Sequence, residues 1–203
     1  MPLHFPIPAL PRSPPSFCRQ WALAFVALVS AACLLAVPVA ALADTIPVKA
    51  AELRIEEGEV LLNAEFEFSL NPTLEDALDK GIPLYFDLEF ELTRGRWYWL
   101  DEKVAHTALV YRVSYNALTN QYRVASGLLT QTFNSLEEVE HFIGRITSRP
   151  VASADALTKG AKYEAAVRLR LDVNQLPKPF QVNALASREW TLASEWQRWS
   201  FTP

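Results

Sequence analysis

Apolar and polar side chains alternate at every second position through most of the chain beyond residue 44. In the clearest run, five apolar side chains alternate with polar ones; these apolar residues are Leu84, Phe86, Leu88, Phe90 and Leu92. Successive side chains of a β-strand point to opposite faces, so the pattern predicts a strand with one buried face and one face in water. Similar runs at residues 52–56, 62–70, 109–115 and 163–173 extend this prediction to most of the chain.

The segments between these runs favour antiparallel pairing. Arg94-Gly95 is predicted to turn the chain tightly, so that residues 84–92 and 96–100 form a hairpin. Residues 116–120 are predicted to form a loop that leads into the next strand at Tyr122. The regular alternation of strands and helices that is typical of a parallel α/β sheet is missing from the sequence.

Two short helices are predicted to interrupt the strands. Asn71-Pro72 has the residue types of a helix N-cap and first turn, and Gly81 is the expected stop. Ser135 and Glu138 have the spacing of a capping box, and apolar residues follow them at helical spacing as far as Ile146. Residues 147–160 are predicted to be a loop.

The last predicted strand lies within residues 190–201, where the apolar pattern changes phase between Trp196 and Trp199. Such a change predicts a β-bulge. About eight strands with mostly hairpin connections predict a mainly β fold, a single antiparallel β-sandwich that is immunoglobulin-like in general architecture. It carries two short helices and follows an N-terminal signal or anchor helix.

Residues 1–43 differ in composition from the rest of the chain. They hold half of the prolines, both cysteines and only two charged residues, and no charge lies between Trp21 and Ala43. This apolar stretch, followed by Pro38 and the small residues of Ala41-Leu42-Ala43, is typical of a secretory signal peptide cleaved between Ala43 and Asp44. An uncleaved membrane anchor is the alternative, because the stretch is long enough to span a bilayer. Residues 44–203 then form the β-sandwich domain.

Composition excludes several kinds of site. Residues 44–203 contain no cysteine, which excludes disulfides, thiol nucleophiles and thiolate metal sites from that part. The formal net charge of −4 argues against binding nucleic acid, and no phosphate-binding glycine motif is present. His106 and His141 are expected to be structural, although a hydrolase that uses either of them with nearby carboxylates is kept as an alternative. No cofactor and no metal are expected.

Aromatic and arginine side chains gather in two short segments. They are the candidate partner- or ligand-binding residues, namely Arg94, Arg96, Trp97, Trp99, Trp196, Arg198 and Trp199. Rings flanked by arginines on an exposed face would stack on sugars, lipid head groups or a partner protein. Burial of the tryptophans between two sheets is the alternative.

Several of these features together resemble a known family. They are the leader, the alternating strand at residues 84–92, Trp97-Tyr98-Trp99, the hairpin from Tyr115 to Tyr122 and the closing tryptophans. The chain resembles a proteobacterial family of unknown function, number 4390 among such domains, whose members are sometimes labelled proline-rich signal peptide proteins. The resemblance implies an exported envelope protein, often encoded beside a nitrogen-regulation-type sensor kinase. It implies no catalytic residue and no ligand.

The sequence therefore predicts an exported, non-enzymatic binding or interaction module in the periplasm. Its expected partner is a membrane sensor or another envelope component, and it would touch the membrane only through an uncleaved leader in the inner membrane. A periplasmic carrier or chaperone for an apolar ligand is the alternative, with the ligand held between the sheets or under the helix at residues 135–146. The sequence leaves the oligomeric state open.

Overall fold

The computed structural model describes residues 45–96 and 101–203, which belong to one compact unit. The predicted leader, its cleavage site at Ala43–Asp44, and Trp97 and Trp99 lie outside the described residues. Within these ranges the fold is mainly β, with nine strands in two antiparallel sheets, three α-helices and three short 3-10 helices. No helix among the described residues is long and apolar enough to cross a bilayer.

The larger sheet has six strands in the order β6-β5-β4-β3-β8-β9. Their bounds are β3 Leu84–Arg94, β4 Glu102–Asn116, β5 Gln121–Ser126, β6 Leu129–Phe133, β8 Tyr163–Leu171 and β9 Gln197–Phe201. Strand β3 lies at the centre and is paired on both sides, with Leu88 opposite Leu109 of β4 and Leu169 of β8. All five apolar side chains of the clearest alternating run are buried.

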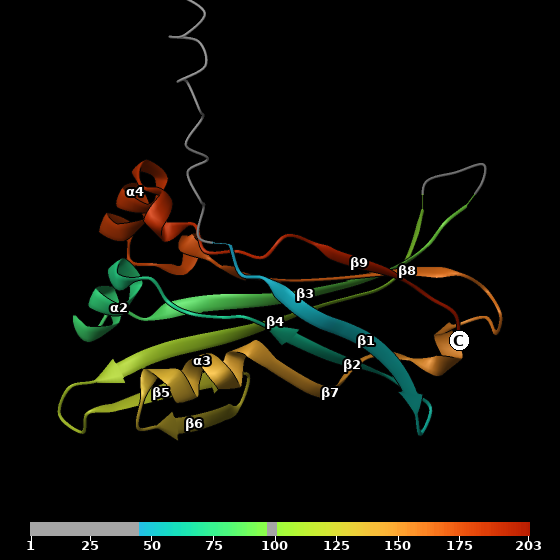
Figure 1. The fold of residues 1–203 in the computed structure, drawn as a ribbon, viewed down its shortest axis with the longest axis horizontal. Coiled ribbons are helices and arrows are strands. Elements are labelled where there is room, and N and C mark those ends of the chain that lie inside the picture. The colour runs from blue at the N-terminus through green and yellow to red at the C-terminus, as the bar shows by residue number, and fades with distance from the viewer. Residues whose placement is uncertain (1–44, 97–100) are drawn as a thin grey trace, which may run out of the picture. The chain divides into compact units, whose positions relative to one another are not determined.

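The smaller sheet has three strands in the order β1-β2-β7, with bounds β1 Val48–Glu56, β2 Glu59–Phe66 and β7 Arg145–Ser153. Its strands run obliquely across those of the larger sheet (Figure 1). Buried side chains of both sheets belong to a single hydrophobic core, which includes Leu62 of β2 and Phe86 of β3. The alternating patterns of the two sheets therefore turn their apolar faces toward a common interior.

Two helices form where the sequence predicts them. In α2 (Pro72–Asp79), the Asn71 side chain accepts a hydrogen bond from the Leu74 N–H at 3.0 Å. In α3 (Leu136–Gly144), the Ser135 hydroxyl accepts one from the Glu138 N–H at 3.2 Å. A third helix, α4 (Lys178–Ala186), was not expected, nor were the 3-10 turns η1 Ala154–Ala156, η2 Val173–Gln175 and η3 Arg188–Trp190.

The prediction of a loop over residues 147–160 is wrong in its first half, because Arg145–Ser153 forms strand β7 beside β2. Only Ile146 and Val151 of this strand are buried, and the register with β2 shifts twice. These irregularities remove the alternation on which a sequence prediction depends. Helix α3 correspondingly ends at Gly144, and Ile146 belongs to the strand.

The pairing beside β8 contains one extra residue just before β9. Ala193 lies opposite Arg170 and Gln197 lies opposite Val167, so four residues along this segment correspond to three along β8. This irregularity agrees with the predicted bulge near Trp196, and the register is regular from Gln197 to Phe201. Beyond Arg96, the predicted second arm of the hairpin at residues 96–100 lies outside the described residues. In the described structure, β3 pairs antiparallel with the long strand β4, which begins at Glu102.

Gly144, the last residue of α3, lies very close to strand β2. A Cβ atom at this position would be 2.8 Å from the carbonyl oxygen of Phe66. We expect Gly144→Ala to lower the free energy of unfolding by about 1–3 kcal/mol, because backbone must move to relieve the overlap. Gly95→Ala is the matched control, since its Cβ would meet nothing closer than 3.9 Å. Urea denaturation of both variants measures the difference, and equal stabilities would contradict the expectation.

Candidate binding site

A cleft opens where the larger sheet extends beyond the smaller one. Helix α3 lies over the inner face of β5 and β6, and β7 borders the same region (Figure 1). Between them is a cleft of about 420 Å³. Its lining residues are Leu109, Tyr111, Val124, Ser126, Leu129, Gln131, His141, Phe142, Arg145, Ile146, Thr147 and Arg149.

The floor of the cleft is the inner face of three neighbouring strands. Tyr111 of β4 lies opposite Ser126 of β5, which lies opposite Leu129 of β6, so the three side chains form one row across the sheet. The small Ser126 side chain leaves space between two larger ones. On the opposite side, the Phe142 ring of α3 meets the Tyr111 ring edge-on, with centroids 6.2 Å apart.

The polar groups of the cleft are basic or neutral. His141, Arg145 and Arg149 supply positive or ionisable groups, and no carboxylate is among the lining residues. Arg145 lies 3.8 Å from Glu65, whereas Arg149 has no ion pair within the described part of the chain. Burial raises the pKa of Tyr111, and the nearby charge of Arg149 opposes this effect. The cleft thus combines an apolar floor with basic groups at its side, an arrangement suited to a ligand with an apolar part and an anionic part.

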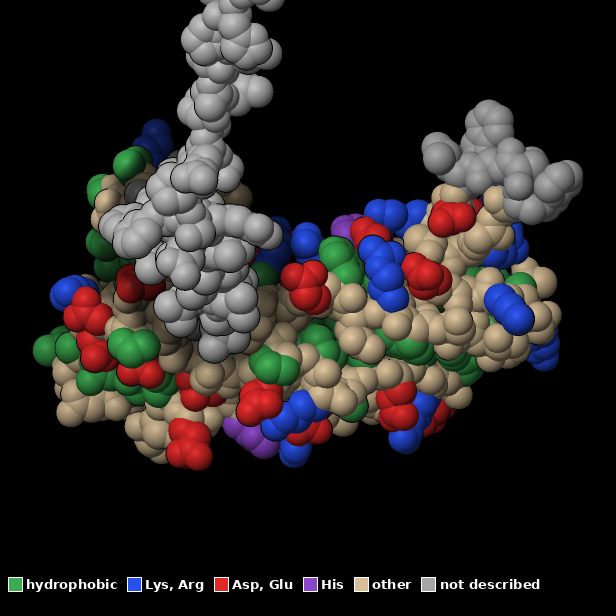
Figure 2. Space-filling view, turned by 45° about the horizontal axis from the view of Figure 1, so that its top comes forward, with side chains coloured by type: hydrophobic (Ala, Val, Ile, Leu, Met, Phe, Trp, Pro, Cys, Tyr) green, Lys and Arg blue, Asp and Glu red, His purple; other side chains and the backbone are tan. Residues whose placement is uncertain are grey.

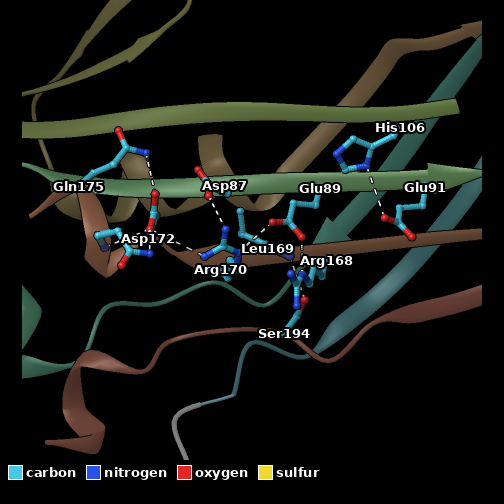
Figure 3. A network of polar contacts seen from close by, with 11 residues as sticks. Asp87, Glu89, Glu91, His106, Arg168, Leu169, Arg170, Asp172, Gln175 and Ser194 are labelled. Atoms are coloured by element: carbon cyan, nitrogen blue, oxygen red, sulfur yellow. Dashed lines mark hydrogen bonds and ion pairs between the residues drawn. The ribbon is translucent and has the colours of Figure 1, made fainter. Parts of the chain in front are cut away.

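A second polar cluster lies on the opposite face of the larger sheet (Figure 3). Glu89 of β3 accepts hydrogen bonds from Arg168 at 2.5 Å and from Arg170 at 2.9 Å, both on β8. Arg170 also contacts Asp87 at 2.9 Å, and the Trp196 ring lies 4.5 Å from the Arg168 guanidinium. The cross-strand register explains the grouping, because Asp87 lies opposite Arg170 and Glu89 opposite Arg168.

The carboxylates of this outer cluster have shifted pKa values. Burial raises the pKa of Asp87 despite the charge of Arg170. Burial alone would also raise the pKa of Glu89, but the hydrogen bonds from Arg168 and Arg170 outweigh it and lower the pKa. Asp87 is 7% exposed, and its Oδ1 atom has no hydrogen-bond partner among the described residues. The carboxylates and arginines of this cluster pair with one another. The cluster therefore joins β3 to β8 and leaves few charged groups available to a ligand.

The two histidines lie on opposite sides of the larger sheet, and neither belongs to a hydrogen-bonded catalytic arrangement within the described ranges. The Nδ1 atom of His106 on β4 is 3.5 Å from a carboxylate oxygen of Glu91. His141 is exposed on α3 and also borders a depression of about 230 Å³ that is lined by four glutamates, Glu65, Glu67, Glu137 and Glu140. In residues 45–96 and 101–203, no group of three or more His, Cys, Asp or Glu side chains is placed to hold a metal ion.

The aromatic and arginine residues predicted from the sequence do not form one exposed patch in the described structure. Arg94 and Arg96 both pair with Glu102, and Arg198 pairs with Glu164 at 2.9 Å. Strand alternation places Trp199 beside the core, whereas Arg198 lies on the outer face. The surface in Figure 2 likewise shows acidic and basic side chains interspersed.

Sequence reasoning missed the cleft, although it proposed an apolar ligand between the sheets or under this helix. The sequence holds one signal that links the basic groups of the cleft: His141, Arg145 and Arg149 are spaced four residues apart. This spacing would have been assigned to a helix face, but the helix ends at Gly144 and the last two residues lie on β7. The apolar floor comes from strands whose neighbours are set only by the sheet topology.

A family model described as Domain of unknown function (DUF4390) matches residues 43–200 of the chain. No curated protein and no solved structure matches it.

The outer cluster predicts a pH-dependent contribution to stability. We expect Glu89→Gln to lower the free energy of unfolding by about 1–2 kcal/mol at neutral pH, because it removes an anionic acceptor shared by two arginines. Since folding lowers the pKa of Glu89, its contribution is present above the unfolded value near 4.5 and is lost as pH falls through the lower folded value. The difference from the wild type should therefore shrink as the pH falls below 4.5.

The matched control is Glu195→Gln, which changes an exposed carboxylate without an ion pair in the described structure. Thermal denaturation between pH 3 and 8 measures both variants. A Glu89→Gln deficit that is independent of pH would show that the carboxylate charge is not its origin.

Proposed function

The chain belongs to the family described as Domain of unknown function (DUF4390), and on that premise we propose that it is an exported, non-enzymatic binding module of the cell envelope. The cleft under α3 is the observation that carries the proposal. It offers about 420 Å³ beside an apolar floor, within the range of small-molecule and side-chain pockets. Its ligand places an apolar group on the floor of the cleft, beside the contacting rings of Tyr111 and Phe142.

The fold supports a binding role because it supplies a rigid floor. We propose that the two sheets form a β-sandwich, immunoglobulin-like in general architecture. Support comes from the single core that they share and from the oblique crossing of their strands (Figure 1). In such a fold, the sheets hold the site in place, and binding specificity lies in the side chains around it.

Export is proposed from the sequence of the leader. An uncharged stretch before Ala41-Leu42-Ala43 favours secretion to the periplasm, with residues 44–203 as the mature domain. An uncleaved leader would instead tether the same domain to the inner membrane. The proposed partner is the periplasmic part of a membrane sensor or another envelope component, and nucleic acid is not a proposed ligand.

The arginine- and tryptophan-rich segments play a smaller part in this proposal than the cleft does. Ion pairs with Glu102 already engage Arg94 and Arg96, and Trp199 packs against the core. Trp196 and Arg198 remain on the outer face, where they can add contacts to a partner that binds there. The cleft offers apolar surface that no described segment fills.

A periplasmic carrier for an apolar ligand is the second candidate, and the same cleft favours it. A carrier retains its ligand through purification, whereas a module that binds a partner transiently does not. Native mass spectrometry of protein isolated from the periplasm distinguishes the two. A stoichiometric extra mass in the lipid range supports the carrier, and a bare protein mass supports the module.

Enzymatic activity is not part of the proposal. A hydrolase would need His106 or His141 to activate a nucleophile, and neither histidine makes a hydrogen bond to a serine, threonine or tyrosine in the described structure. His141 does border the depression lined by glutamates, so a hydrolase at that place would depend on this side chain.

Filling the cleft should weaken binding of an apolar probe. The dye 1-anilinonaphthalene-8-sulfonate carries apolar rings and an anionic group, and we expect its fluorescence to rise when it binds the wild type. Ser126→Trp fills the floor, so we expect at least about tenfold weaker dye binding. Ser114→Trp is the matched control, because strand alternation places Ser114 on the outer face of β4. Equal dye affinity of the wild type and Ser126→Trp would contradict the cleft as the binding site.

A further inference from the structure

Strand β6 is an unprotected edge of the larger sheet. The two sheets have four edge strands, β6, β9, β1 and β7, and natural proteins usually guard such edges with charge or proline. Strand β1 carries four charged residues, β7 contains Arg145, Arg149 and Pro150, and β9 contains Arg198. The five residues of β6, Leu-Thr-Gln-Thr-Phe, include no charge and no proline.

The open side of β6 offers backbone groups for pairing. A two-residue turn at Gly127-Leu128 joins it to β5, so Ser126 and Leu129 form the closing pair. In an antiparallel ladder, pairs that exchange hydrogen bonds alternate with pairs that do not. The N–H and C=O groups of Thr130 and Thr132 therefore point away from β5. Among the described residues, no strand pairs with β6 on that side.

The same edge forms the rim of the cleft. Leu129 and Gln131 of β6 line the cleft, and two leucines at the turn are strongly exposed, Leu128 at 104% and Leu129 at 71%. A strand added beside β6 would direct every second side chain to this inner face. Those side chains would meet the apolar floor and the basic groups of His141, Arg145 and Arg149.

We propose that an extended segment of a partner protein adds to β6 as a seventh strand and places apolar and acidic side chains in the cleft. This inference rests on the proposed function, since it names the ligand of the same cleft. Backbone hydrogen bonds to Thr130 and Thr132 supply affinity, and the cleft supplies specificity. The acidic preference follows mainly from Arg149, which has no ion pair in the described structure, and from the lack of a carboxylate in the lining.

The probe is a heptapeptide with blocked ends. It has threonine at positions 1, 3, 5 and 7, leucine at positions 2 and 6, and glutamate at position 4, so one face carries the apolar and acidic side chains. We expect it to bind the wild type in a fluorescence-anisotropy titration and to protect the amides of Thr130 and Thr132 from hydrogen exchange. A peptide N-methylated at positions 3 and 5 lacks the donors that face β6, and we expect no binding.

Two matched pairs of variants separate the backbone from the charge. Thr130→Pro removes an edge donor and should weaken binding about tenfold, whereas Thr130→Ala keeps the donor and should bind as the wild type does. Arg149→Gln should weaken binding of the glutamate peptide about three- to fivefold, whereas Arg112→Gln on the outer face of β4 should leave it unchanged. Replacing the peptide glutamate by lysine should remove the effect of Arg149→Gln.

The outcomes distinguish this inference from the proposed function. Equal affinity for the N-methylated peptide or for Thr130→Pro overturns strand addition. If dodecanoate binds the cleft and competes with the dye while no peptide binds, the inference fails, but the cleft stands as the binding site and the carrier for an apolar ligand is favoured over the interaction module. If neither binds, both fail. A dimer of the wild type that Thr130→Pro abolishes would identify a second copy of the chain as the occupant, and this too overturns the inference.

Discussion

Burial of the inner face of β3 is the interaction on which the rest of the structure depends. Leu84, Phe86 and Phe90 are among the most deeply buried side chains of the core, and the strand is paired on both sides. Burying a large apolar side chain contributes about 1.5–3 kcal/mol, so this single face supplies a substantial part of the driving force for folding. The buried face of β3 also fixes the register of its neighbours β4 and β8, because a slip by one residue would expose their apolar side chains to water.

The opposite face of the same strand explains the outer cluster. Once the apolar residues of β3 face inward, Asp87 and Glu89 must face outward, and the register places Arg170 and Arg168 beside them. Their mutual ion pairs reduce the cost of partly burying four charges under the segment that precedes β9. The cluster is thus a consequence of strand pairing, and its ion pairs stabilise the contact between β3 and β8.

The cleft arises from a mismatch between the two sheets. Six strands on one side face three on the other, and α3 covers only part of the excess. The inner faces of β4, β5 and β6 therefore stay partly accessible beside the basic residues of β7 and α3. A binding site at this place needs no sequence motif, because the shape of the cleft comes from the different widths of the two sheets. The two sheets hold the cleft in place, and the side chains that line it supply the proposed specificity.

The sequence by itself determined the mainly β, antiparallel character of the fold, the faces of β2, β3 and β8, and the caps of α2 and α3, because these depend on neighbours a few residues apart. It did not determine strand β7, whose alternation is broken by shifts in register, or α4. The sequence named Arg94, Arg96, Trp196 and Arg198 as candidates, but it did not show that Glu102 and Glu164 engage the three arginines. The tertiary structure alone decided that Tyr111, Ser126, Leu129 and Arg149 share a cleft. The physical reason is that strand order and the relative widths of two sheets are set by packing between distant segments, which no local pattern records.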